Sequence, residues 1–157
     1  MGRARHQPTA CLIFFCPHCR SWRATRLIRR TITATVELTK ENFDEVAGSN
    51  DFVIVDFWAP WCGPCQSFGP VYEEISGKYP DIVFAKVNTE AEQELAGHFQ
   101  IRSIPTLMIL RDQIVIYSQP GALMGGQFEQ LIEKAKELDM DDIRRQVAEQ
   151  QAGAQEG

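Results

Sequence analysis

The first part of the chain lacks a long apolar segment. Its longest apolar run extends only from Cys11 to Cys16. A secretory signal needs an apolar core of about 7–15 residues, and a helix that crosses a bilayer needs about 20. The run is too short for either, so we expect no export signal and no association with a membrane.

Acidic residues are absent from the first 30 residues, which contain seven arginines. The rest of the 157-residue chain holds nine Lys and Arg against all 21 Asp and Glu, so its formal net charge is −12. Such an acidic body repels phosphate backbones, which argues against nucleic acid as the working partner. We interpret the basic start as a solvated tail. Its composition also resembles an organelle import sequence, which stays open as an alternative.

Cysteine is scarce as well. The chain has five cysteines, and only Cys62 and Cys65 lie in its regularly patterned part. A small secreted protein that depends on a disulfide framework has more pairs than this, so we expect a reducing compartment, with the cytoplasm as first choice. There is no internal repeat, and the length suits one domain with tails, which we expect to be a monomer.

Apolar runs alternate with stretches of helical spacing through residues 32–138. We predict strands at 31–38, 52–57, 82–87, 106–110 and 114–118, and helices at 39–48, 62–78, 90–99 and 126–138. Strands that alternate with helices and end in a hairpin and a helix predict an α/β fold, with a central mixed sheet flanked by helices. The hairpin link, Arg111-Asp112-Gln113, lacks the glycine typical of tight turns.

The chain divides into three parts by its patterns. Residues 1–31 form a basic extension that contains cysteines, residues 32–138 form the α/β domain, and residues 139–157 form an added helix with a tail. Met140, Ile143 and Val147 recur on one face of that helix, so we expect it to pack on its own domain. In the last helix of the domain we expect an inward face made of Phe128, Leu131, Ile132, Ala135 and Leu138.

The most informative motif is Trp61-Cys62-Gly63-Pro64-Cys65, between a predicted buried strand and a predicted helix. Two cysteines separated by two residues at a helix start are suited to dithiol–disulfide exchange. The helix N-terminus favours the thiolate of Cys62, which lowers its pKa below the ordinary value of about 8.5 and makes it the nucleophile. Cys65, one turn further and more buried, is the resolving thiol. The alternative, half of a zinc site, lacks a second cysteine pair in the domain.

Residues 36–138 resemble thioredoxin beyond this motif. The matches lie at family spacing and comprise Val55-Asp56-Phe57-Trp58, Pro70, Ala85-Lys86-Val87, Ile104-Pro105-Thr106 and Gly121-Ala122. The segments 87–92 and 101–106 are most similar to the bacterial thioredoxin-2 subgroup. The resemblance implies a thioredoxin fold and a protein-disulfide reductase that carries no cofactor on this domain. It also implies disulfide-containing client proteins and an NADPH-dependent thioredoxin reductase as partners.

Asp56 is an isolated acid in an apolar strand, where an unpaired charge is costly. The resemblance implies that it lies beneath the resolving cysteine and takes its proton. Burial is expected to raise the pKa of Asp56 towards that of a working base. Lys86 occupies the family's lysine position in the next strand, and we expect it to pair with Asp56. A purely structural buried ion pair is the alternative.

Pro105 matches the cis-proline of the family, and its loop is implied to lie beside the reactive sulfur. An extended client segment would then add along Ile104 as a short strand. We predict that the apolar rim around Cys62 consists of Trp61, Gly63, Pro64, Ile104, Pro105, Gly121 and Ala122. Trp58 is expected in the core. Gln66 stands where relatives often have Lys or Arg, which removes a positive charge beside the site.

Members of the thioredoxin-2 subgroup carry an N-terminal zinc finger made of two Cys-x-x-Cys pairs. This chain has only Cys16 and Cys19 as a pair, with Cys11 upstream. A zinc ion at these three cysteines would need a fourth ligand, for which His6 or His18 is available. The alternative is a tail with incidental thiols.

Two other functions remain open from the sequence. One is a disulfide oxidant or isomerase, although the Gly63-Pro64 spacer favours a reductase. The other is a redox-independent binding module or chaperone-like subunit on the same fold, because a fold alone does not determine function.

Overall fold

The computed structural model describes residues 35–154, and its description of side chains ends at residue 150. All of these residues belong to one unit of the chain, Ile32–Gly157. No helix in this described part is long and apolar enough to cross a membrane.

A mixed five-stranded sheet forms the centre of this unit, in the order β1-β3-β2-β4-β5. β2 runs parallel to β3 and antiparallel to β4, and β4 and β5 form an antiparallel hairpin. The strands are β1 (Val36–Glu37), β2 (Phe52–Trp58), β3 (Val83–Asn88), β4 (Thr106–Arg111) and β5 (Ile114–Pro120). The predicted α/β fold with a mixed sheet is confirmed.

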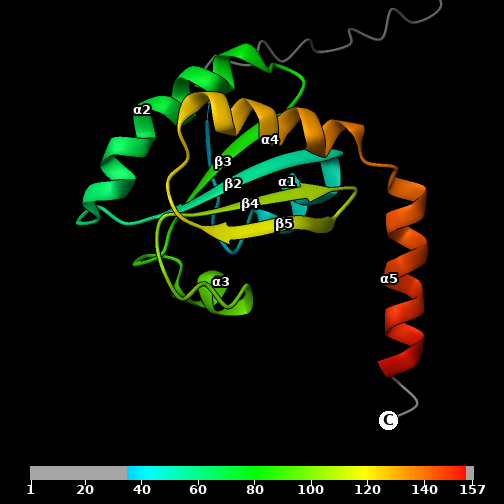
Figure 1. Ribbon diagram of the computed structural model, residues 1–157. Helices are drawn as coiled ribbons and strands as arrows, with labels where there is room; N and C mark the ends of the chain where they lie inside the picture. Colours follow the sequence, from blue (N-terminus) through cyan, green and yellow to red (C-terminus); the bar gives the residue numbers. More distant parts are fainter. Residues whose placement is uncertain (1–34, 155–157) are drawn as a thin grey trace, which may run out of the picture. The chain divides into compact units, whose positions relative to one another are not determined.

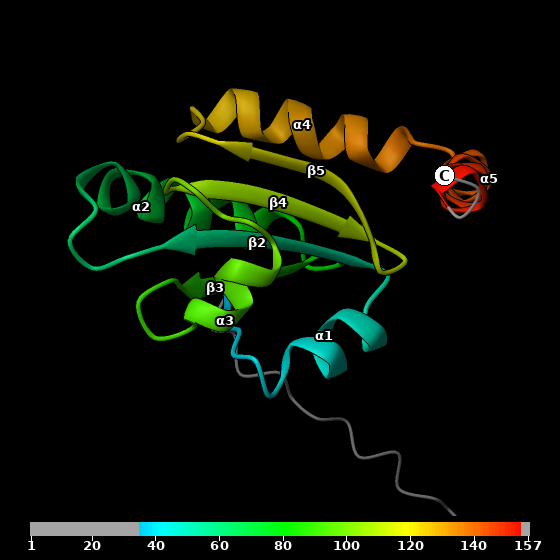
Figure 2. The same ribbon diagram turned by 90° about the horizontal axis from the view of Figure 1, so that it is seen from below.

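Helices cover both faces of the sheet, α2 and α4 on one and α1 and α3 on the other (Figures 1 and 2). The helices are α1 (Phe43–Ser49), α2 (Gly63–Lys78), α3 (Gln93–His98), α4 (Gly125–Glu137) and α5 (Met140–Ala154). The residues that follow β2 form the start of α2, so the Cys62–Cys65 motif lies at one end of the sheet.

β2 separates two apolar cores. Ile54 packs with α2 and α4, whereas Val53, Val55 and Phe57 pack with α1 and α3. Because side chains alternate between faces along a strand, Asp56 points to the same face as Ile54. The one acid of this strand is therefore directed into the core beneath α2.

The hairpin between β4 and β5 closes with a two-residue turn even though it has no glycine. Asp112 and Gln113 have φ values of 50° and 66°. A type I′ turn requires φ > 0 at both central positions, which non-glycine residues adopt at a cost. The Asp112 side chain is in turn held by Arg144 of α5, at 2.6 Å. The tight turn was uncertain from the sequence, because the contact that supports it comes from α5, far along the chain.

Two local predictions were wrong. The helix predicted at 39–48 begins later, because α1 starts at Phe43 with Asn42 as its N-cap, and the Asn42 side chain accepts the Thr39 backbone N–H at 2.8 Å. Leu138 does not extend the inward face of α4, because the helix ends at Glu137 and Leu138 follows in an extended conformation. Its side chain is 41% exposed. Both errors concern helix ends, where local patterns fix the boundary least well.

The added helix is present as α5, and its first turns contact the domain. Met140 is buried, and Ile143 and Val147 are half-buried. On the domain side, one guanidinium nitrogen of Arg111 donates to the carbonyls of Ala135 (2.8 Å), Lys136 (3.2 Å) and Leu138 (3.1 Å). These carbonyls lie at the C-terminus of α4, where the last groups have no partner within the helix.

We expect Arg111→Met to destabilise the domain by about 2–3 kcal/mol, because carbonyls partly withdrawn from water lose a charged donor. Urea unfolding followed by circular dichroism measures this loss. Arg144→Met is the matched control: its exposed ion pairs with Asp112 and Asp141 are worth at most about 1 kcal/mol. Equal effects of the two substitutions would contradict the capping role of Arg111.

Candidate active site

Cys62 and Cys65 meet at the N-terminus of α2. Cys62 is the N-cap residue of the helix, and its sulfur accepts the backbone N–H of Cys65 at 3.2 Å. The two sulfurs form a disulfide with an S–S distance of 2.07 Å. The chain is thus in its oxidised form, and an N–H group of the helix end already points at the Cys62 sulfur. The same N–H group favours negative charge on that sulfur once the disulfide is reduced.

The two cysteines are equally buried in this form, each 4% exposed. The sequence predicted a more buried Cys65. That difference is absent because Trp58, Ala59 and Ile104 pack around both cysteines as one small cluster. The half-buried Trp58 lines the disulfide rather than either main core.

The loop before β4 lies beside the sulfurs. Ile104 packs against the cysteine cluster, and the Ile104–Pro105 peptide bond is cis, as the resemblance implies. The Pro105 carbonyl accepts the backbone N–H of Gly121 at 2.8 Å, which joins this loop to the one after β5. Gly121 has a φ of 119°, a conformation that side chains disfavour. The structure therefore places Ile104 beside the cysteines and joins Pro105 to Gly121.

The remaining rim residues face solvent. Trp61 is 68% exposed, and Gly63, Pro64 and Ala122 are exposed as well. A large exposed aromatic ring beside a reactive disulfide is a ready contact for a protein surface.

Asp56 is the buried ionisable group of the site, with 1% of its surface exposed. Its Oδ1 atom has no hydrogen-bond partner among the described residues. Burial raises the pKa of Asp56 to about 7, and the positive charge of Lys86 opposes that rise. A carboxyl group with this pKa exchanges a proton near neutral pH, which is what a general base needs.

Lys86 does not form the predicted ion pair with Asp56. The two residues are neighbours across β2 and β3, but the Lys86 ammonium binds Glu73 of α2 at 2.9 Å. The sequence showed the lysine and the aspartate at matching positions. It did not show that α2 presents a competing carboxylate to the lysine.

Sequence reasoning missed two further contacts. The buried Tyr72 hydroxyl lies 2.8 Å from the carbonyls of Ile54 and Ala85, and accepts the Ala85 N–H at 3.1 Å. Gln66 donates from its side-chain amide to the Pro60 carbonyl at 2.6 Å, which holds the loop before Cys62. The only sequence signal for the Tyr72 contacts was a tyrosine on the apolar face of α2. No sequence signal indicated the Gln66 contact.

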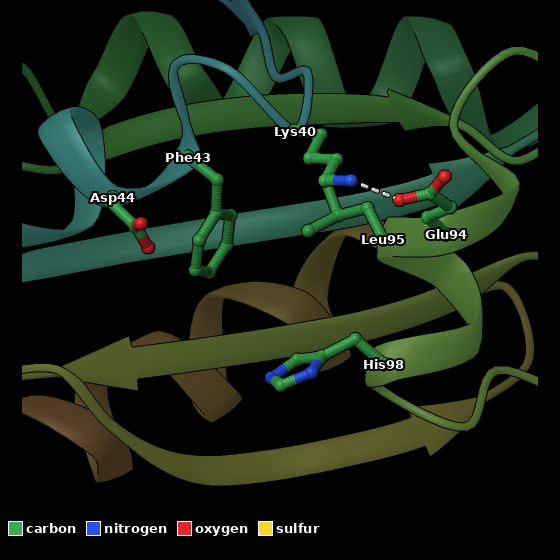
Figure 3. A pocket seen from close by; sticks show the side chains of 6 residues that line it. All are labelled: Lys40, Phe43, Asp44, Glu94, Leu95 and His98. Atoms are coloured by element: carbon green, nitrogen blue, oxygen red, sulfur yellow. Dashed lines mark hydrogen bonds and ion pairs between the residues drawn. The ribbon is translucent and has the colours of Figure 1, made fainter.

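A pocket of about 290 Å³ lies between α1 and α3, on the face of the sheet opposite to α2 (Figure 3). It is lined by Lys40, Phe43, Asp44, Glu94, Leu95 and His98, and Lys40 and Glu94 form an ion pair at its side. It contains no cysteine, so it is separate from the redox site.

The candidate zinc ligands Cys11, Cys16 and Cys19, with His6 and His18, lie outside the described residues, and zinc there stays a prediction. In the described part of the chain, no group of three or more His, Cys, Asp or Glu side chains is placed to hold a metal ion.

The geometry agrees with the comparisons to known proteins. The thioredoxin family model matches residues 34–136. A Streptomyces coelicolor protein named "Putative thioredoxin 2" is 58% identical over 123 residues, which cover 78% of this chain and 92% of that protein. Thioredoxin 2 of Chlorobaculum tepidum is 44% identical over 89 residues, covering 55% and 82%. The structure of Plasmodium falciparum thioredoxin superposes with a TM-score of 0.60 at 37% identity, covering 64% and 98%.

Thioredoxin domains carry no cofactor, and none is needed for exchange between thiols and disulfides. The matched family, the paired cysteines at the start of α2 and the buried carboxyl on β2 all lead to one conclusion. This chain belongs to the thioredoxin family and is a thioredoxin-type dithiol–disulfide oxidoreductase.

Proposed function

We propose that this protein works as a reductase of disulfides in client proteins and is re-reduced by an NADPH-dependent thioredoxin reductase. The observation that carries the proposal is the Cys62 sulfur at the N-cap of α2, with the Cys65 N–H directed at it. This arrangement stabilises the thiolate, which is the attacking species in disulfide exchange.

In the first step the Cys62 thiolate attacks one sulfur of the client disulfide. The client S–S bond breaks, one client thiolate leaves and takes up a proton, and Cys62 is joined to the client. In the second step the Cys65 thiolate attacks the Cys62 sulfur and releases the other client thiolate. Two electrons have then passed to the client, and the Cys62–Cys65 disulfide is the form seen in this structure.

Asp56 is the proposed base that takes the proton of Cys65 before the second step. The proposal is supported by the burial of Asp56 and by its pKa of about 7. At this pKa a large fraction of the carboxyl is ionised at neutral pH and still basic enough to accept a proton.

Trp61, Pro64, Ile104 and Ala122 are the proposed contact surface for clients. An extended client segment placed along Ile104 would add main-chain hydrogen bonds, while its side chains contact the exposed Trp61 ring. We further propose that the protein is a monomer that carries electrons between reductase and clients in the cytoplasm. Its cysteine content supports this location.

Insulin disulfide reduction tests the proposal. We expect the purified full-length protein to precipitate the insulin B chain with either dithiothreitol or thioredoxin reductase and NADPH as electron donor. Turnover with dithiothreitol but not with thioredoxin reductase and NADPH would support the disulfide-reductase chemistry and contradict thioredoxin reductase as the partner. No turnover with either donor would contradict the reductase and favour an oxidant, which reoxidation of a reduced model protein would reveal.

A further inference from the structure

The charge of the Lys86 ammonium lowers the pKa of the buried Asp56 carboxyl, and a residue outside the redox motif determines where this ammonium lies. Lys86 and Asp56 occupy paired positions on β3 and β2. Yet Lys86 binds Glu73 of α2 at 2.9 Å, with its own side chain 21% exposed and that of Glu73 59% exposed. The ammonium is therefore directed to the partly exposed carboxylate of Glu73 on α2 rather than into the core.

Tyr72, which precedes Glu73 on α2, lines the inner side of this arrangement. Its ring centroid is 5.8 Å from the Lys86 ammonium. Its hydroxyl contacts the Ile54 and Ala85 carbonyls, one on each of the two strands that carry Asp56 and Lys86. Two consecutive residues of α2 thus position the lysine: the Tyr72 ring lies against its ammonium, and the Glu73 carboxylate binds it.

Few other groups act on Asp56. Lys86 faces it from β3, and Tyr72 acts on it from α2, where the charge of Asp56 adds to burial in raising the pKa of the tyrosine. Its partner on β4 is the apolar Leu107. The sulfurs at the start of α2 add a titratable thiol when reduced. Burial is the largest cause of the raised pKa of Asp56 and the charge of Lys86 opposes it, so a change in the position of the Lys86 ammonium is expected to change this pKa.

We propose that Glu73 is a positioning residue for the resolving step. Its carboxylate binds the Lys86 ammonium and so prevents a direct ion pair between Lys86 and Asp56. The inference rests on the proposed role of Asp56 as base. A carboxylate bound directly to an ammonium is a weaker base than one that is only near it. Glu73 thereby keeps Asp56 able to accept a proton near neutral pH.

The test is the titration of the Asp56 carboxyl, followed by carbon-13 NMR on the reduced full-length protein. In Glu73→Gln the lysine is released and free to bind Asp56, so we expect the midpoint to fall by about one pH unit. We expect the pH profile of insulin reduction to move in the same direction. Glu74→Gln is the matched control, because it removes the same charge from the next residue of α2, which binds Lys78 instead.

A double-mutant cycle separates positioning from a direct effect of the Glu73 charge. In a Lys86→Met background, Glu73→Gln is expected to leave the Asp56 midpoint unchanged. The proposal is overturned if Glu73→Gln alone causes no fall, or if the same fall persists without Lys86. The titration needs no client, so its result stands even if the protein fails to reduce insulin, and failure of the proposed function is recognised separately.

Discussion

Cys62→Ser abolishes disulfide reduction if Cys62 is the nucleophile. The hydroxyl that replaces the thiol is almost entirely protonated at neutral pH and cannot form the mixed disulfide. We expect insulin reduction to fall by at least about a thousandfold, to the rate of the uncatalysed exchange. The fold should persist, because serine is a favoured N-cap and its oxygen can accept the Cys65 N–H that Cys62 now accepts.

Cys65→Ser is the matched variant for the second step. It leaves the nucleophile in place but removes the resolving thiol, so the client should remain attached to Cys62. Non-reducing electrophoresis and mass spectrometry detect this adduct, and dithiothreitol releases it. Undiminished turnover of Cys62→Ser would contradict Cys62 as the nucleophile, and full biological activity of a variant that no longer reduces disulfides would favour the redox-independent binding module.

The second large effect is expected at Asp56, on stability and on the pH profile together. The native pKa of about 7 lies above the reference value of 3.8, so the folded protein binds this proton more tightly than the unfolded chain. The contribution of Asp56 to stability is therefore largest below about pH 4 and is lost as the pH rises to about 7. Integrated over that interval, the loss is about 4 kcal/mol.

Asp56→Asn removes this titration while keeping the shape of the side chain. We expect the variant to be more stable than the parent protein at pH 8 by up to about 4 kcal/mol, and the difference to vanish near pH 4. Urea unfolding of both reduced proteins at several pH values measures it. A difference independent of pH would mean that Asp56 titrates normally.

The same substitution should slow the resolving step. Loss of a positioned general base typically costs about a hundredfold or more, and the rate profile should lose its inflection near pH 7. Rapid-mixing kinetics on a preformed mixed disulfide isolates this step. If Asp56→Asn gains stability but its resolving step keeps the parental pH profile, Asp56 has only a structural role.

Much of this site was predictable from the sequence, because its chemistry is local. The Cys62–Cys65 pair, the helix that begins with it and the apolar strand with a single acid are all readable within a few residues. The cis peptide before Pro105 and its place beside the sulfurs came from the resemblance to thioredoxin.

What the sequence did not yield depends on contacts between distant elements. The partner of Lys86 is a carboxylate 13 positions earlier on α2, and neither residue's neighbours indicate the pairing. Likewise, the glycine-free turn at Asp112 is supported by Arg144, 32 positions later. The equal burial of Cys62 and Cys65 also involves Ile104, which comes from a loop distant in the sequence.

The docking of α5 has a practical consequence for fusions. α5 is attached beside the β4–β5 turn, and the start of α2, which carries the disulfide, lies at the other end of the sheet (Figure 1). The six residues of β4 alone separate these ends by about 20 Å. A cargo joined after α5 by a short linker would be held away from the thiols, so it neither shields them from soluble clients nor is readily reduced itself. A flexible linker that brings the cargo back across about 30 Å needs on the order of 30 residues.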